Sequence, residues 1–76
     1  MQKFDQELDA RGLVCPLPIL RTKQALADMI SGQVLKIIAT DPAAEIDFKV
    51  FSEQTGHRLL SMTEIDAQLV FFLKKK

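Results

Sequence analysis

The scarcity of cross-linking residues limits how this chain can fold. Its 76 residues include one cysteine and one histidine, so an internal disulfide and a structural zinc site are both excluded. A domain of this size buries only about 60–65% of the surface of its unfolded chain, so its stability is marginal. The 47% hydrophobic content is sufficient for one apolar core. We therefore expect a single domain, residues 1–76, that is held together by packing alone.

Charge and composition narrow the class of function. Ten basic and ten acidic residues give a net charge of zero, whereas a nucleic-acid-binding protein normally carries a basic surface. Tryptophan and tyrosine are absent, so bases have few side chains on which to stack. No signal-like or membrane-spanning apolar segment is visible. We expect a monomeric cytoplasmic protein, without direct nucleic-acid or membrane partners, whose thiol stays reduced.

Hydrophobic periodicity predicts the elements of the first half of the chain. Alternation over residues 4–10 indicates a half-buried strand, with one face made by Phe4, Gln6, Leu8 and Ala10. From Pro16 to about Ile30 the spacing predicts a helix that ends at Gly32 in the C′ position. Its buried side carries Ile19, Thr22, Leu26 and Met29. The β-branched segment Gln33–Ala39 predicts a second, buried strand.

The second half predicts a helix and a hairpin. Asp41 is the expected cap of the helix and Pro42 its first residue. Gly56 ends this helix, whose buried stripe is Ala44, Phe48, Phe51 and Thr55. Residues 57–63 and 67–75 read as two strands joined by a turn at residues 64–66. The apolar run Leu69–Leu73 does not alternate, which is typical of a central strand.

The element order β-α-β-α-β-β predicts an α/β two-layer sandwich. Right-handed crossovers place both helices on one face of the sheet. We expect a four-stranded mixed sheet with strand order 1-2-4-3, in which the last strand is antiparallel to the others and lies in the interior.

The stretch "LVCPLPIL" places Cys15 at the start of the first helix. A residue before proline disfavours the helical region, so Cys15 is expected as the N-cap and Pro16 as the first helical residue. Pro18 is compatible with the first turn, where amides lack intrahelical partners. A helix N-terminus favours a thiolate, so we expect a modestly lowered pKa for Cys15. The alternative is an inert, half-buried cysteine.

The sequence around this cysteine resembles the TusA/SirA family of small sulfur-carrier proteins. The resemblance is carried by "LDARGLVCPLP", residues 8–18, with its Cys-Pro-x-Pro core, and by "TDPAA" and "TGH" at the two ends of the second helix. It extends over almost the whole chain. The family has the β-α-β-α-β-β sandwich, which is the class expected from the periodicity.

The resemblance implies that Cys15 carries sulfur as a persulfide, without any other cofactor or metal. The sulfur would come from a donor such as a cysteine desulfurase or rhodanese. It would pass to an acceptor protein in tRNA thiolation, molybdenum-cofactor chemistry or sulfur oxidation. Gly12, Pro16 and Pro18 would shape the motif. Some members have a second cysteine where this chain has Ser52, so we expect a sulfurtransferase-type carrier with one cysteine. We do not expect a free-standing enzyme.

Two other features suggest different functions. His57 could act as a base for Cys15, but its expected strand lies at the far edge of the sheet. The three C-terminal lysines read as a solvated, frayed end. The fold also resembles a ribosome-contacting domain of a bacterial translation initiation factor, so the alternative function is a non-catalytic RNA- or protein-binding module.

A carrier must present its sulfur to a partner, so side chains around Cys15 must be accessible. Leu17 and Arg21 are the predicted partner contacts, and Arg11 would add positive charge to the rim. Leu13 and Val14 flank the cysteine and could instead belong to the core. We also expect Ser52 to lie at the flank of the buried stripe of the second helix, away from the start of the first helix.

Overall fold

The computed structural model describes residues 2–76; Met1, which belongs to the expected domain, lies outside them. The elements are β1 (Gln6–Ala10), α1 (Leu17–Ala27), β2 (Val34–Ala39), α2 (Ala44–Thr55), β3 (Arg58–Ile65) and β4 (Gln68–Lys74). One four-stranded sheet has the order β1-β2-β4-β3. β1 is parallel to β2, and β4 is antiparallel to both of its neighbours. The predicted fold class, strand order and interior place of the last strand are confirmed.

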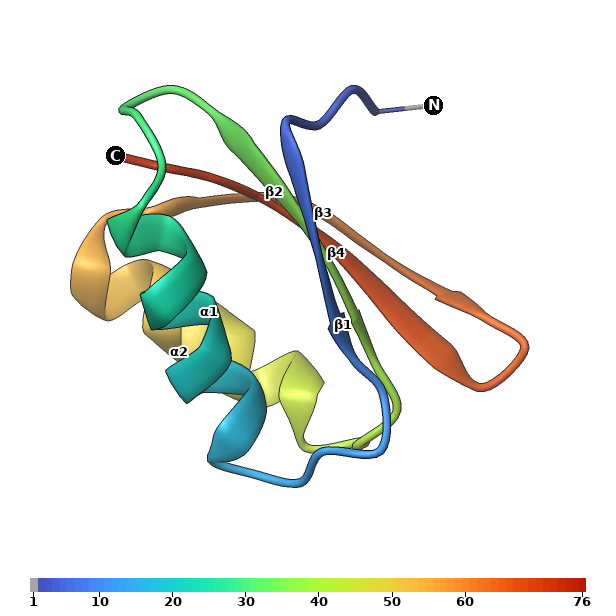
Figure 1. Cartoon of the computed structure of the whole chain (residues 1–76). Coiled ribbons are helices and arrows are strands. Elements are labelled where there is room, and N and C mark those ends of the chain that lie inside the picture. The colour runs from blue at the N-terminus through green and yellow to red at the C-terminus, as the bar shows by residue number, and fades with distance from the viewer. Residues whose placement is uncertain (1) are drawn as a thin grey trace.

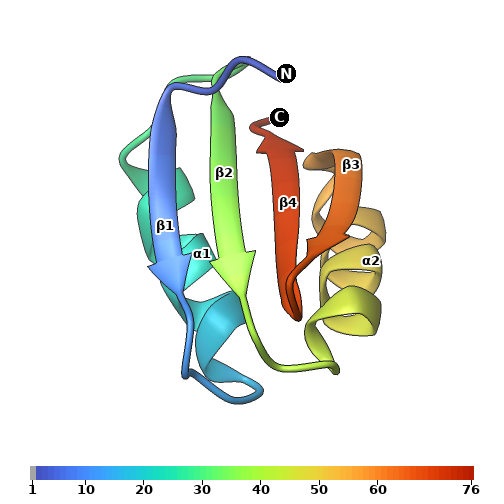
Figure 2. The same ribbon diagram turned by 90° about the vertical axis from the view of Figure 1, so that its right-hand side faces the viewer.

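Both helices cover the same face of the sheet, as Figure 1 shows, and the uncovered face is turned toward the viewer in Figure 2. Side chains alternate along the two interior strands, so every second residue points at the helices. Phe48 of α2 stacks on Phe71 of β4, with ring centroids 4.5 Å apart. The fully buried side chains of the strands lie on this side: Leu35, Ile37, Ala39, Phe71 and Leu73. The core therefore fills the layer between sheet and helices.

The first strand is shorter than predicted. β1 begins at Gln6, and Phe4 lies before it, with its ring 6.1 Å from that of Phe72. Phe72 neighbours Phe71 in β4, so it faces away from the helices. The prediction that Phe4 shares the buried face of Ala10 is wrong, because the residues before β1 do not continue the alternation of the strand.

Helix α1 ends at Ala27, before the predicted end near residue 30. Lys75 Nζ donates to the carbonyl oxygens of Leu26 and Met29, both at 2.6 Å, and so satisfies carbonyls at the end of the helix. Gly32 lies in the turn before β2, with φ at 91°, and is not the C′ residue of α1. The expectation of a frayed lysine tail is wrong for Lys75, because its ammonium group is partly buried and bonded.

Helix α2 begins at Ala44, with Ala43 as its N-cap. Pro42, predicted as the first helical residue, lies in a turn before the helix. Gly56 ends α2 with φ at 84°, as predicted. This left-handed conformation favours glycine, because a Cβ atom would crowd the backbone.

The hairpin that follows α2 turns later than predicted. β3 continues to Ile65, and Asp66 and Ala67 form the turn, whereas the sequence indicated residues 64–66. Both turn residues have positive φ, 49° and 64°. Two-residue hairpins favour this conformation because its twist matches that of the strands.

Candidate functional site

Cys15 lies exposed in the loop between β1 and α1. Its peptide bond to Pro16 is cis. Pro16 is the N-cap of α1, with φ −98° and ψ 15°, and the helix begins at Leu17. The prediction of Cys15 as N-cap and Pro16 as first helical residue is therefore wrong by one position, because the backbone of Pro16 is not yet helical. Pro18 lies in the first turn as predicted.

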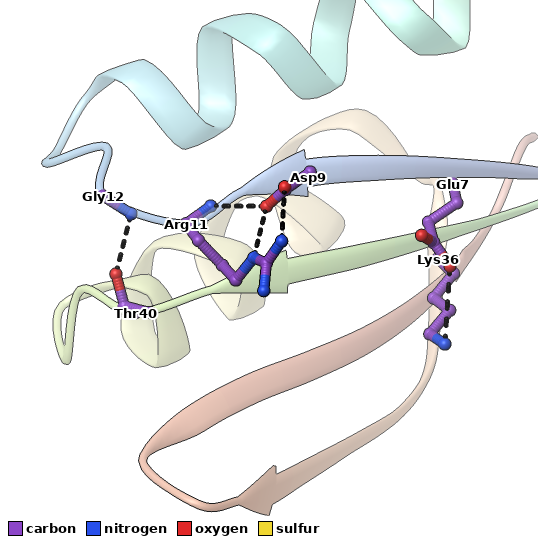
Figure 3. Close-up of polar contacts among 6 residues, drawn as sticks. All are labelled: Glu7, Asp9, Arg11, Gly12, Lys36 and Thr40. Atoms are coloured by element: carbon purple, nitrogen blue, oxygen red, sulfur yellow. Dashed lines mark hydrogen bonds and ion pairs between the residues drawn. The ribbon is translucent and has the colours of Figure 1, made fainter.

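Hydrogen bonds join the Cys15 loop to the loop between β2 and α2. Cys15 N donates to Asp41 Oδ2 at 2.8 Å. Gly12 N donates to Thr40 Oγ1 at 2.9 Å, as Figure 3 shows. The second oxygen of Asp41, Oδ1, accepts from Ala43 N at 3.0 Å. The predicted cap residue Asp41 therefore does not occupy the N-cap of α2, and it connects the cysteine to the start of that helix instead. Sequence reasoning missed this connection.

Gly12 is needed for its backbone conformation. Its φ is 80°, and a Cβ atom built there would meet no atom within 4 Å, so steric crowding does not explain the glycine. The positive φ turns the chain out of β1 toward Cys15. Gly12 thus lies at the turn between β1 and Cys15, and its role in shaping the motif stays a prediction.

Arg11 does not bring a free positive charge to the cysteine. Its Nε and Nη2 atoms donate to Oδ1 and Oδ2 of Asp9, both at 2.8 Å (Figure 3). These hydrogen bonds lower the pKa of Asp9 to about 2. Because Asp9 compensates the Arg11 charge, the pairing weakens the case for Arg11 as a partner contact.

A shallow pocket opens beside Cys15, between the two helices. The cysteine lies at its edge together with the N-cap residue of α1. The walls come from both helices: Ile19 and Lys23 of α1, and Asp47, Val50, Phe51, Gln54 and Thr55 of α2. The first helix start and one side of the second helix thus form a single site.

The pKa of the Cys15 thiol is raised above its ordinary value, mainly by a hydrogen bond to the Asp47 carboxylate. Partial desolvation and the negative charges of Asp47 and Asp41 act in the same direction. The predicted lowering is therefore wrong. Pro16 and Pro18 supply no amide protons at the helix start, and the negative charges of Asp47 and Asp41 reach the thiol from other parts of the chain.

The predicted contact residues differ in exposure. Val14 is 64% exposed and Leu17 is 41% exposed, whereas Leu13 packs partly against the core. Arg21 is exposed on α1. Their contact with a partner stays a prediction.

Further exposed apolar side chains on the two helices were not identified from the sequence. Ile46 is 68% exposed and Val50 is 43% exposed on α2, and Leu20 is 46% exposed on α1. Val50 lines the Cys15 pocket. Ile46 and Val50 are four residues apart and lie off the buried stripe, which is the sequence signal that could have found them.

His57 lies outside the Cys15 pocket. Its Nδ1 atom accepts a hydrogen bond from Lys76 N at 3.0 Å, and its ring stacks on Phe51 with centroids 5.7 Å apart. These contacts fix His57 at the start of β3. The structure thus gives Cys15 no histidine base, in agreement with the sequence argument.

Neither a metal site nor a membrane span is found between residues 2 and 76. No group of three or more side chains of the ligating kinds lies together in this part of the chain. The helices within the same residues are too short and too polar to cross a bilayer.

Comparison with known proteins places this site in a family. The family described as sulfurtransferase TusA matches the chain over residues 6–75, which include the whole Cys15 loop and pocket. The chain belongs to the TusA family.

Relatives in this family match the chain over nearly its full length. It is 55% identical to the sulfur carrier protein TusA of Allochromatium vinosum, over 99% of both chains. It is 45% identical to the putative sulfur carrier protein YrkI of Bacillus subtilis, over 96% of this chain and 97% of that protein. A crystal structure of a SirA-like protein from Desulfitobacterium hafniense superposes with a TM-score of 0.82 at 25% identity. It covers 92% of this chain and 96% of the other.

Proposed function

We propose that this chain is a sulfur carrier that holds a sulfane sulfur atom as a persulfide on Cys15. The observation that supports this most directly is the placement of the chain's single thiol. Cys15 is exposed on a loop that is tied to the second helix through Asp41. A sulfur atom added to this thiol would stand at the surface, where a partner can reach it. The persulfide is covalent, so the carrier needs no other cofactor.

The sulfur would pass from one protein to another. A donor such as a cysteine desulfurase or rhodanese would supply it, and an acceptor in tRNA thiolation, molybdenum-cofactor chemistry or sulfur oxidation would receive it. The relatives named above as sulfur carriers support a relay role. Cys15 has no histidine beside it to serve as a base, so the partner completes the reaction site.

Sulfur loading tests the proposal. Wild-type protein incubated with a persulfide donor should gain the mass of one sulfur atom, measured by intact-protein mass spectrometry. Cys15→Ser should gain none and should melt at nearly the wild-type temperature, because the side chain is exposed. A wild-type protein that gains no sulfur would favour the alternative, a non-catalytic RNA- or protein-binding module.

Transient docking on the exposed apolar side chains around Cys15 would bring the partners together. Val14 comes before α1 and Leu17 begins it, and Val50 lines the Cys15 pocket from α2. Small transient interfaces combine an apolar centre with a charged rim that steers the encounter. Arg21 is the exposed cation on α1 that we assign to this rim.

Reversal of the rim charge tests this docking surface. Arg21→Glu should slow sulfur transfer from a protein donor, and the defect should shrink as salt is added. Alkylation of Cys15 by a small neutral reagent should stay at the wild-type rate, which serves as the control. Equal transfer rates of variant and wild type at low ionic strength would contradict this surface.

A further inference from the structure

We propose that Asp47 is a positioning residue that holds Cys15 in its protonated, resting form between sulfur transfers. This inference rests on the proposed sulfur-carrier function. It concerns how that function is controlled. If the exposed Cys15 were ionised to the thiolate, it would react with any small electrophile or disulfide that reaches it.

The first step of the argument is the placement of Cys15 against α2. The Asp41 carboxylate accepts the amide proton of Cys15 through Oδ2 and that of Ala43 through Oδ1, at 2.8 and 3.0 Å. Both bonds tie the cysteine backbone to the N-terminal end of α2. Cys15 therefore lies beside the N-terminal end of α2, and Asp47 belongs to the first turn of that helix.

The second step is the composition of the pocket. Cys15 and Asp47 line the same pocket, so the carboxylate and the thiol lie close to each other although they come from different segments. Of the other charged groups around it, Asp41 lies on the loop before α2, and Lys23 lines the pocket from further along α1. Arg11, on the loop of the cysteine itself, is paired with Asp9. Two carboxylates, Asp47 and Asp41, and one cation, Lys23, therefore lie around Cys15, so negative charge outweighs positive charge there.

The chemical consequence follows from these charges. A thiol can donate its proton to a carboxylate, whereas a thiolate beside the same carboxylate is repelled. The thiol form of Cys15 is therefore favoured, in the direction that the raised pKa also indicates. Small reagents that need the thiolate should react slowly with the free carrier.

Sulfur transfer must then remove this proton. The Cys15 sulfur attacks the outer sulfur of the donor persulfide, a new S–S bond forms, and the S–S bond of the donor breaks. The electron pair leaves on the inner sulfur of the donor, which takes up the proton that Cys15 releases. The donor ends as a thiol and Cys15 as a persulfide, with no net oxidation. The leaving sulfur of the partner thus supplies the base that the free carrier lacks.

The test compares two charge-neutralising substitutions in the first turn of α2. Asp47→Asn removes the carboxylate beside the thiol. Glu45→Gln removes the same charge from the same turn, but Glu45 faces Lys49, at 3.4 Å, and does not line the Cys15 pocket. The two substitutions therefore remove the same charge from the same helix turn, and they differ in that only Asp47 lines the Cys15 pocket.

The rate of Cys15 alkylation by iodoacetamide is measured across pH on sulfur-free protein. In Asp47→Asn the midpoint of the profile should move to lower pH, and the rate at neutral pH should rise at least about threefold. Glu45→Gln should follow the wild-type profile, and Asp47→Glu should restore part of the wild-type behaviour. Thermal melting checks that each variant is folded.

An unchanged profile in Asp47→Asn would overturn the proposal. A slower reaction would also overturn it, since that result would make Asp47 a base that activates the thiol. Sulfur loading of the wild type is measured separately with a persulfide donor. Absence of loading would refute the carrier function, whereas the alkylation profile decides the role of Asp47 in either case.

Discussion

Single side chains decide the environment of the thiol. Asp41 accepts hydrogen bonds from two backbone amides, those of Cys15 and Ala43, and these bonds lower its pKa. The carboxylate therefore stays ionised over the working range of pH and keeps the Cys15 loop on the second helix. A neighbouring carboxylate, Asp47, acts on the sulfur itself. Two aspartates with similar charge thus have different tasks, one for the backbone and one for the thiol.

The histidine at the start of β3 gives a prediction at the same scale. Burial, followed by the charges of Lys75 and Lys76, lowers the pKa of His57 below its ordinary value of 6.5. The folded protein thus favours the neutral ring, whose Nδ1 accepts the Lys76 amide proton. The stability from this effect is fully present above the unfolded value, about 6.5, and is lost as pH falls through the lower folded value.

Proton NMR of the only histidine should give a titration midpoint below that of the chain unfolded in urea. The melting temperature should fall over the same pH range in wild type, and less in His57→Gln. A titration midpoint of His57 in the folded protein at or above that of the unfolded chain would show that burial and the two lysines do not disfavour the charged imidazole.

At the scale of elements, Ser52 connects the end of α2 to the start of β3. Its Oγ donates to the carbonyl oxygen of His57 at 2.5 Å and accepts from Leu59 N at 3.2 Å. The side chain is partly buried. This partial burial agrees with the expected place at the flank of the buried stripe, but the two hydrogen bonds, through which one hydroxyl joins the end of the helix to the next strand, were not expected.

Ser52→Ala should lower the free energy of unfolding by about 1–2 kcal/mol, because two backbone groups lose their partner. Sulfur transfer should stay within about twofold of wild type, since Ser52 does not line the Cys15 pocket. Urea unfolding and transfer assays measure the two effects. Ser61→Ala on β3, where the serine is exposed, is the control and should change stability by less than about 0.5 kcal/mol. A tenfold loss of transfer in Ser52→Ala would mean that the end of α2 takes part in the chemistry.

At the scale of the whole molecule, the arrangement of elements was predictable from the sequence. Hydrophobic periodicity and turn residues predicted the six elements, and the handedness of the crossovers predicted the strand order. The run Leu69–Leu73 placed the last strand inside the sheet. These features follow from rules that apply within one segment or between neighbouring segments.

Contacts between segments distant in the sequence were not predictable. The expected lowering of the Cys15 pKa considered only the position of the cysteine at the start of α1. The pKa is raised instead, because Asp47, on the other helix, acts on the thiol. The end expected for α1 was Gly32, whereas the helix ends at Ala27, and Lys75 from the far end of the chain bonds the carbonyls of Leu26 and Met29 there. Both residues read as ordinary charged surface positions until the fold brings their partners beside them.

The segment that follows β4 gives the last prediction, because it joins three parts of the molecule. Lys75 Nζ donates to two carbonyls at the end of α1, and its own backbone exchanges hydrogen bonds with Gln33 and Gly32 before β2. A cation at this place also complements the negative end of the helix dipole.

Lys75→Met keeps the length of the side chain but removes the ammonium group and leaves two carbonyls without their donor. It should lower the free energy of unfolding by about 1–3 kcal/mol, which lowers the melting temperature by about 4–8 °C for each kcal/mol in a domain of this size. The matched control is Lys74→Met, since Lys74 is exposed on the neighbouring position, and it should stay within about 0.5 kcal/mol of wild type. Hydrogen exchange should locate the loss at the last turn of α1 and the start of β2. Equal melting temperatures for the two variants would contradict this prediction. They would mean that water satisfies the carbonyls of Leu26 and Met29 and that Lys75 contributes little to joining the end of the chain to the first helix.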